Sequence, residues 1–169
     1  RATKLKAGEY QFQGPMTAPQ VFRKLVRGEI YYHRVTVPEG LRSAQIFPLF
    51  IKEGFGSEEE FRREFLSVSR ISDLDPEAVD LEGYLFPDTY ALARGTSASE
   101  IVDLMVRHHR DLWGDEWARS CKAHGLTVRQ AVTLASLIEK ETGQGGERGL
   151  VSSVFHNRLK EGMKLQCDP

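Results

Sequence analysis

Helix-capping residues and glycines divide this chain into a series of short helices. The segment that begins at Thr127 is typical, because Thr127 and Gln130 have the spacing of a capping box and apolar residues follow at helical intervals. Gly143 ends it, as glycine commonly ends helices. Ser43, Ser57 and Ser97 are predicted as further N-caps. Helices are therefore predicted over residues 18–27, 44–53, from 57 onward, 98–113, 116–123, 127–142 and 147–161.

Two segments near the start of the chain alternate polar and apolar residues, as half-buried strands do. They are residues 9–12 and residues 30–37, and the helix predicted over 18–27 lies between them. This order predicts a small β-α-β unit over residues 1–37. Strands and helices together predict an α+β fold.

Residues 81–90 gather aromatic and apolar side chains around Gly83 and Pro87. A proline argues against a central strand, so this segment is predicted to be a rigid, shaped loop. It follows a polar, turn-rich connection over residues 69–80. Two interpretations stay open: a buried aromatic connector, or a platform on which a sugar ring stacks.

The composition is that of a globular protein, and it disfavours nucleic acids and metal ions as ligands. The chain has 169 residues, 23 Lys and Arg against 24 Asp and Glu, and a formal net charge of −1. Nucleic acid is not an expected partner, because binding through phosphates needs a basic excess. Cys121 and Cys167 have no histidine at zinc spacing, so no metal site is expected. The abrupt ends at Arg1 and Pro169 indicate an excerpt of a longer protein.

The candidate chemistry lies in the carboxylates at the end of the helix predicted over 127–142. At about 100° per residue, Glu139 and Glu141 lie about 200° apart on that helix. They cannot both point at one bond, so at most one of them is expected to act as an acid or base. The alternative is an ordinary charged helix end, although acids at a helix C-terminus oppose the macrodipole.

Three blocks of the sequence, taken together, resemble the MltG (YceG-like) family of endolytic murein transglycosylases. All three blocks match that family in order and spacing. They are LEGYLFPDTY at 81–90, ASLIEKET at 135–142 and VSSVFHNRLKEGMKLQCDP at 151–169. Residues 6–10 and the helix after them look like the LysM-like module of that family. Departures are small: Cys167 stands where a threonine is usual, and residues 144–146 replace a small apolar run.

The resemblance implies cleavage of the β-1,4 bond between MurNAc and GlcNAc inside glycan strands. One glutamate acts first as general acid and then as base, the 6-hydroxyl of the same MurNAc closes a 1,6-anhydro ring, and neither metal nor cofactor is needed. The catalytic glutamate of the family maps onto Glu141, with Glu139 in reserve. The same resemblance suggests that five polar or aromatic residues line the cleft of Glu141 and contact the glycan: Glu82, Tyr84, Asp88, Asn157 and Gln166. The alternative is that Glu82 and Asp88 cap local turns and Asn157 holds a loop.

The resemblance also predicts the organisation and surroundings of the protein. A LysM-like module is expected over residues 1–37, a helical connecting subdomain over 38–80, and the N-terminal part of the catalytic domain over 81–169. The partners implied are peptidoglycan glycan strands and peptidoglycan synthases. The implied location is the extracytoplasmic face of the inner (plasma) membrane, with a single-pass anchor upstream of this chain.

Two other functions compete with the transglycosylase. The first is a non-catalytic peptidoglycan-binding module, which the LysM-like start suggests. The second is an aminodeoxychorismate lyase-type enzyme, because the family has carried that label. A pyridoxal-phosphate lyase needs a buried Schiff-base lysine and a phosphate cup. Lys140 is expected to point away from the apolar face of its helix, which disfavours this function.

Overall fold

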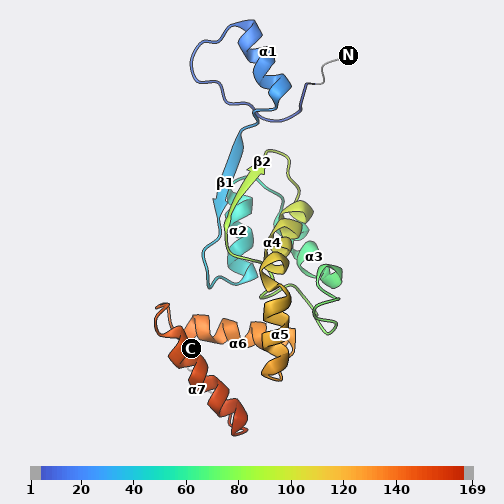
Figure 1. Cartoon of the computed structure of the whole chain (residues 1–169). Helices are drawn as coiled ribbons and strands as arrows, with labels where there is room; N and C mark the ends of the chain where they lie inside the picture. Colours follow the sequence, from blue (N-terminus) through green and yellow to red (C-terminus); the bar gives the residue numbers. More distant parts are fainter. Residues whose placement is uncertain (1–4, 166–169) are drawn as a thin grey trace.

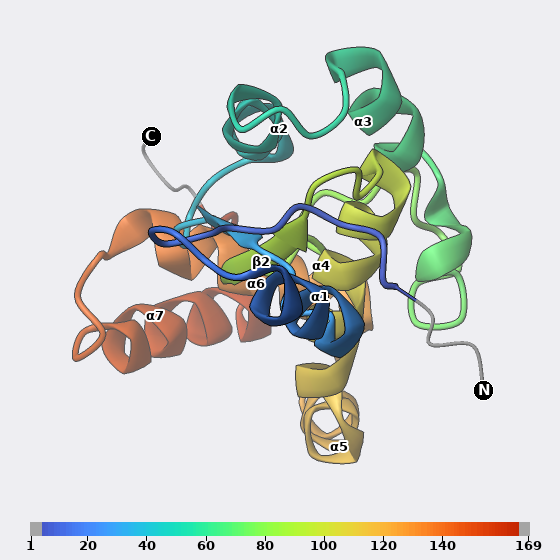
Figure 2. The ribbon, with the colours of Figure 1, turned by 90° about the horizontal axis from the view of Figure 1, so that it is seen from above.

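The fold is α+β, as the sequence predicts, and the computed structural model describes residues 5–165 apart from the side chain of residue 115. In chain order its elements are α1 (Ala18–Arg27), β1 (Tyr32–Thr36), α2 (Ser43–Lys52), α3 (Glu58–Phe65), a 3-10 turn (Val68–Arg70), β2 (Thr89–Ala93), α4 (Ala98–Trp113), α5 (Asp115–Ala123), α6 (Val128–Glu141) and α7 (Arg148–Lys160). Figure 1 shows α1 at one end of an elongated molecule, the two strands with α2, α3 and α4 in the middle, and α5, α6 and α7 at the other end. Seen from above, α2 and α3 lie on one side and α7 on the opposite side (Figure 2).

The hydrophobic core lies in the middle of the molecule, where helices cover a two-stranded antiparallel sheet. Val35 of β1 is paired with Tyr90 of β2, and the Tyr90 ring lies 6.1 Å from the ring of Phe50 on α2. Two strands alone are marginally stable in water, so the sheet depends on this cover. Phe50 and Met105 are fully buried, and burying a side chain of this size stabilises the fold by about 1.5–3 kcal/mol.

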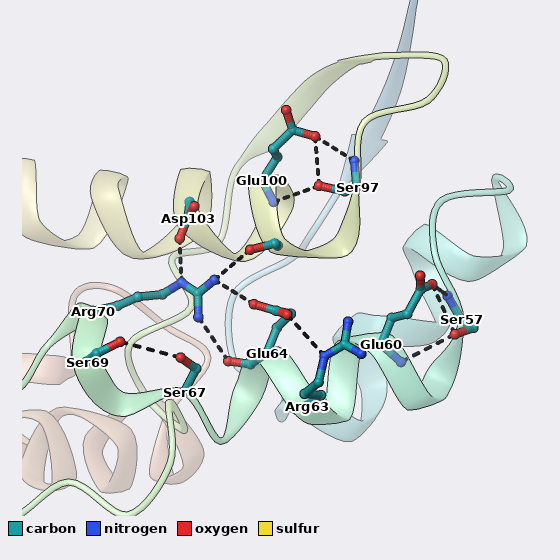
Figure 3. Close-up of polar contacts among 11 residues, drawn as sticks. Ser57, Glu60, Arg63, Glu64, Ser67, Ser69, Arg70, Ser97, Glu100 and Asp103 are labelled. Carbon is teal, nitrogen blue, oxygen red and sulfur yellow. Dashed lines mark hydrogen bonds and ion pairs between the residues drawn. The ribbon is translucent and has the colours of Figure 1, made fainter.

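A partly buried arginine joins α3, the 3-10 turn and α4 (Figure 3). The guanidinium of Arg70 donates hydrogen bonds to Glu64 at 2.7 Å and to Ser99 Oγ at 2.9 Å, and it also pairs with Asp103. The hydrogen bond from Arg70 lowers the pKa of the Glu64 carboxyl, although burial opposes the shift. This network fixes the helices that hold the 81–90 segment in place.

The N-caps predicted from the sequence at Ser57 and Ser97 are confirmed, and each is part of a capping box. Glu60 accepts a hydrogen bond from the backbone N–H of Ser57, and Glu100 accepts one from that of Ser97 (Figure 3). Each serine hydroxyl in turn accepts a bond from the backbone N–H of its glutamate. These reciprocal pairs satisfy donors that a helix start otherwise leaves unpaired.

The strand predicted over residues 9–12 is wrong. The segment has no regular secondary structure, and one backbone bond, from Tyr31 N to Glu9 O at 2.7 Å, links it to the chain before β1. In the described chain β1 pairs with β2, and residues 9–12 do not add a strand to that sheet. Within residues 5–37 the chain therefore forms one helix and one strand rather than a β-α-β unit.

Two further local predictions are corrected. The segment over 81–90 is not a loop throughout, because β2 begins at Thr89, two residues after Pro87. Ser43 is the first residue of α2 rather than its cap, and Arg42 occupies the cap position. The physical reason is that the carboxylate of Glu82 accepts hydrogen bonds from both the backbone N–H and the hydroxyl of Ser43.

The three units predicted over 1–37, 38–80 and 81–169 remain a prediction. The core itself crosses both boundaries, since Val35, Phe50 and Met105 belong to one buried cluster. Within the described chain, every helix is too short or too polar to cross a membrane.

Candidate active site

The candidate site lies at the corner between α6 and α7. The helix α6 ends at Glu141, and the next residue, Thr142, is buried. The Thr142 hydroxyl accepts a hydrogen bond from the backbone N–H of Gln144 at 3.1 Å and donates one to Glu147 at 3.1 Å. These bonds order the turn that leads from α6 into α7, so the last turn of α6 has a fixed path into the corner.

The two acids at the end of α6 have different surroundings. The carboxylate of Glu139 lies 3.0 Å from Nη2 of Arg148, which is the first residue of α7. Glu141 is exposed, and no hydrogen bond or ion pair to its carboxylate exists within the described residues. One acid is thus occupied by an ion pair, and the other is open to a ligand. The assignment of Glu141 as the catalytic residue stays a prediction that this difference supports.

Lysine 140 lies between the two acids and is exposed, as the sequence predicts. Its ammonium donates a hydrogen bond to the carbonyl of Gly40 at 2.8 Å. An exposed lysine in a backbone contact is not the buried amine that a pyridoxal-phosphate lyase needs.

Glu82 was predicted to contact substrate, and the structure uses its carboxylate at the start of α2. It accepts a hydrogen bond from Ser43 Oγ at 2.6 Å and a longer one from Ser43 N at 3.3 Å. A carboxylate at a helix N-terminus satisfies free N–H groups and complements the helix dipole. Glu82 therefore caps the start of a helix that is distant in sequence, whereas the alternative drawn from the sequence was a local turn. Its contact with glycan stays a prediction.

Tyr84, a second predicted glycan contact, is a core residue with an occupied hydroxyl. Its phenol donates a hydrogen bond to Asp75 at 2.8 Å, and Arg129 of α6 donates to the same carboxylate oxygen at 2.9 Å. Burial, with a further contribution from Asp75, raises the pKa of the Tyr84 phenol. Burial by itself would raise the pKa of Asp75, but the bonds from Arg129 and Tyr84 outweigh it and lower that pKa.

The remaining predicted contacts are dispersed. Asp88 accepts a hydrogen bond from the backbone N–H of Thr89 at 2.6 Å and lies 3.1 Å from Nδ1 of His108 on α4. Asn157 is exposed on α7. Gln166 lies outside the described residues.

A groove of about 160 Å³ does form beside α6, but at the other half of that helix. Its lining residues include Asp75, Glu82, Tyr84 and Arg129. Arg129 is the second residue of α6 and Glu141 the last, so about 18 Å of helix separates them at 1.5 Å per residue. A single cleft shared by Glu141, Glu82 and Tyr84 remains a prediction.

Sequence reasoning missed the residues that organise both ends of α6. Asp75 and Arg129 anchor its first turn, and Glu39 and Arg148 meet its last turn. Each pair joins segments 54 or more residues apart, so no local pattern could have revealed it. Glu39 lies between Pro38 and Gly40, in the connection from β1 to α2.

Comparison with known proteins identifies the family. A model of the YceG-like family matches residues 1–169. The endolytic murein transglycosylase of Bacillus subtilis (strain 168) is 30% identical in an alignment of 184 residues. The alignment covers 99% of this chain and 51% of that protein. The endolytic murein transglycosylase of Streptococcus pneumoniae serotype 2 is 30% identical over 192 residues, which cover 98% of this chain and 35% of that protein. The chain thus spans about half of the first relative and about a third of the second.

A solved structure agrees with these sequence matches. The crystal structure of a yceG-like protein from Listeria monocytogenes matches 98% of this chain and 60% of its own, with a TM-score of 0.70 and 29% sequence identity. The blocks quoted from the sequence, the family model and this structural match all point the same way. The expected family is confirmed, and this chain belongs to the YceG-like family.

Proposed function

We propose that this chain carries the catalytic acid of an endolytic peptidoglycan lytic transglycosylase, and that this acid is Glu141. The observation that carries the proposal is the open carboxylate of Glu141 at the end of α6, beside a Glu139 that an ion pair occupies. The names of the relatives in Bacillus subtilis and Streptococcus pneumoniae support the reaction class.

The proposed reaction needs one carboxyl group. Protonated Glu141 gives its proton to the glycosidic oxygen while the bond from C1 of MurNAc to that oxygen breaks. The resulting carboxylate takes the proton of the 6-hydroxyl of the same MurNAc as O6 forms its bond to C1. The proton on Glu141 is restored, no water is consumed, and the product has a 1,6-anhydro end. Hydrolases that use two carboxyl groups hold them about 5 Å or about 6.5–9.5 Å apart around the bond, whereas here Arg148 holds the second acid.

The surroundings of the enzyme belong to the same proposal. The substrate is the glycan strand of peptidoglycan, so the site faces the extracytoplasmic side of the inner (plasma) membrane, beside peptidoglycan synthases. An anchoring helix upstream would keep it there. Fractionation of cells that express the full-length protein, with detection in the membrane fraction, tests the location separately from the chemistry.

The decisive experiment is Glu141→Gln in the full-length protein. Glutamine keeps the shape of glutamate and loses the transferable proton, so cleavage should fall by at least the 10²–10⁴-fold typical of acid–base catalysis. Purified sacculi are digested and the products are analysed by mass spectrometry. Glu161→Gln, at another exposed helix end, is the matched control and should keep wild-type activity. Glu139→Gln should cost far less than Glu141→Gln.

The products separate the outcomes. Anhydro-ended muropeptides from the wild type that disappear in the Glu141 variant support the proposal. Reducing-end MurNAc would mean a hydrolase, and full activity of Glu141→Gln would move the acid to Glu139 or out of α6.

One observation favours a glycan-binding role as a second candidate. A hollow of about 380 Å³ between α1 and the segments on either side of it is lined by polar and apolar side chains and one tyrosine, among them Gln11, Lys24 and Tyr31. Such a surface suits a sugar, which needs both hydrogen bonds and a flat apolar contact. A wild-type protein that binds sacculi and releases no product would favour this candidate.

A further inference from the structure

The side chain of Arg148 joins three segments of the chain at the corner beside Glu141. Its Nη2 atom lies 3.0 Å from the carboxylate of Glu139 on α6 and 3.2 Å from that of Glu39, in the turn between β1 and α2. One nitrogen therefore bridges two acids that are 100 residues apart in the sequence. Arg148 itself begins α7, so the bridge fixes two helices and a turn to one another.

A second contact holds the same surfaces together. The ammonium of Lys140 donates to the carbonyl of Gly40 at 2.8 Å. A Cβ atom added at Gly40 would lie 3.8 Å from Cγ of Glu139, so the turn lies close to the last turn of α6. Figure 1 shows the connection between β1 and α2 descending toward α6. The last turn of α6 is thus held from outside the helix.

Packing alone holds α6 and α7 weakly. Within the described chain, α6 buries one residue, Leu134, and α7 buries one, Phe155. The acids at the end of α6 also oppose the helix dipole, which favours fraying of the last turn. A catalytic group, however, must be held within a fraction of an ångström of its working position.

We propose that Arg148 is a positioning residue, which holds the last turn of α6 against the 38–40 turn so that Glu141 has a fixed direction. This inference rests on the proposed function of Glu141. The Nε atom of Arg148 is buried and has no hydrogen-bond partner within the described residues. This arrangement is unfavourable for folding and indicates a role beyond stability. Unpaired buried donors are unfavourable, and locally unfavourable arrangements concentrate at functional sites.

The test compares two arginines in the full-length protein. Arg148→Ala removes the bridge, and Arg148→Lys keeps a positive charge that can reach one or both acids. Arg110→Ala is the matched control, because Arg110 is similarly exposed, 37% against 42% for Arg148, and pairs with Asp73 rather than with the last turn of α6. The measurements are kcat and KM on glycan strands, the unfolding midpoint, and hydrogen exchange of the amides of residues 139–147.

The expected result is a split between kcat and KM. Arg148→Ala should lower kcat by about 10- to 100-fold, the usual effect of misplacing a catalytic group by about 1 Å, with KM changed less than about twofold. Arg148→Lys should recover part of that loss. Arg110→Ala should leave kcat unchanged while its unfolding midpoint falls as much as that of Arg148→Ala, since both ion pairs are exposed and contribute little to stability.

Several results would overturn the inference. They are an unchanged kcat in Arg148→Ala, equal losses of kcat in Arg148→Ala and Arg110→Ala, or an Arg148→Lys variant no better than the alanine variant. If the wild type does not cleave glycan at all, the proposed function fails, and hydrogen exchange still decides the positioning role. Faster exchange over residues 139–147 in Arg148→Ala alone supports it, and unchanged exchange refutes it.

Discussion

Tyr84→Phe separates a structural role for this tyrosine from a role in binding glycan. The substitution removes the hydroxyl that donates to Asp75, a carboxylate that is 5% exposed. A hydrogen bond to a charged group contributes about 1.5–3 kcal/mol, and a buried acceptor that loses a partner costs energy of the same order. Arg129 and the backbone N–H of Glu77 still donate to Asp75, so we expect a loss of about 2 kcal/mol. In a chain of this length that lowers Tm by about 4–8 °C.

The assay is thermal unfolding followed by tryptophan fluorescence. Trp113 reports on this region, because its ring lies 5.6 Å from that of His109, which in turn lies 5.2 Å from the Tyr84 ring. Tyr90→Phe is the control: Tyr90 is equally buried, but its hydroxyl donates to the neutral carbonyl of Phe86. Its loss should cost about 1 kcal/mol.

The effect of Tyr84→Phe on stability should depend on pH. The folded Asp75 carboxyl has a lowered pKa, so its stabilising bonds are fully present above the unfolded value of about 3.9 and are lost as the pH falls through the folded pKa. The cost of Tyr84→Phe should therefore be constant near neutral pH and shrink in acid. A variant with wild-type Tm but weakened binding to sacculi would refute the structural role and restore Tyr84 as a glycan contact.

Three further predictions concern residues next to Tyr84 in the sequence or in the structure. Glu82→Ala should cost about 1 kcal/mol by removing the acceptor for Ser43 at the start of α2, and an unchanged unfolding midpoint would contradict the capping role. Gly83→Ala should cost about 1–3 kcal/mol, because φ is +84° and the new Cβ would lie 2.6 Å from Cγ1 of Val132; Val132→Ala in the same chain should recover part of this loss. Burial, and secondarily a nearby arginine, lower the pKa of His109 to about 4, whereas the unfolded chain binds that proton near pH 6.5. The contribution of His109 to the free energy of unfolding is full above about pH 6.5 and should fall by about 3 kcal/mol as the pH drops to about 4. If the free energy of unfolding is measured with urea at each pH, His109→Phe should remove this fall, and a fall that persists in the variant would contradict the prediction.

The helices could be predicted from the sequence because their signals are local. At Thr127 the capping residue and its glutamine partner are three residues apart, and the structure confirms the pair. Strand pairing is different, since β1 finds its partner at residues 89–93, more than 50 residues away. Residues 9–12 carry the same alternation as a strand and remain unpaired in the sheet. Alternation shows that a segment can be a strand, but only the rest of the fold supplies the neighbour.

The roles of Tyr84 and Glu82 could not be read from residue type for a related reason. A tyrosine next to Gly and Pro suits both a sugar platform and a core, and the deciding neighbours, Asp75 and Arg129, come from other segments. The same holds for Glu82, whose carboxylate is committed to Ser43, 39 residues before it. A family motif does not by itself distinguish a residue that stabilises the fold from one that binds a ligand. The tertiary contacts of the side chain are needed to distinguish them.

At the end of α6, the helix geometry and the tertiary contacts together leave one of the two acids unpaired within the described part of the chain. The helix repeat alone separates Glu139 from Glu141 by about 200°, so the two carboxylates must face different neighbours. Which of them is free is decided by residues outside the helix, because Arg148 binds Glu139 and leaves Glu141 exposed. The paired acid also ties the helix to the 38–40 turn, through Glu39 on the same arginine. In the proposed enzyme, the second carboxylate is therefore no second catalyst, and its charge serves to anchor the arginine that holds the first one in place.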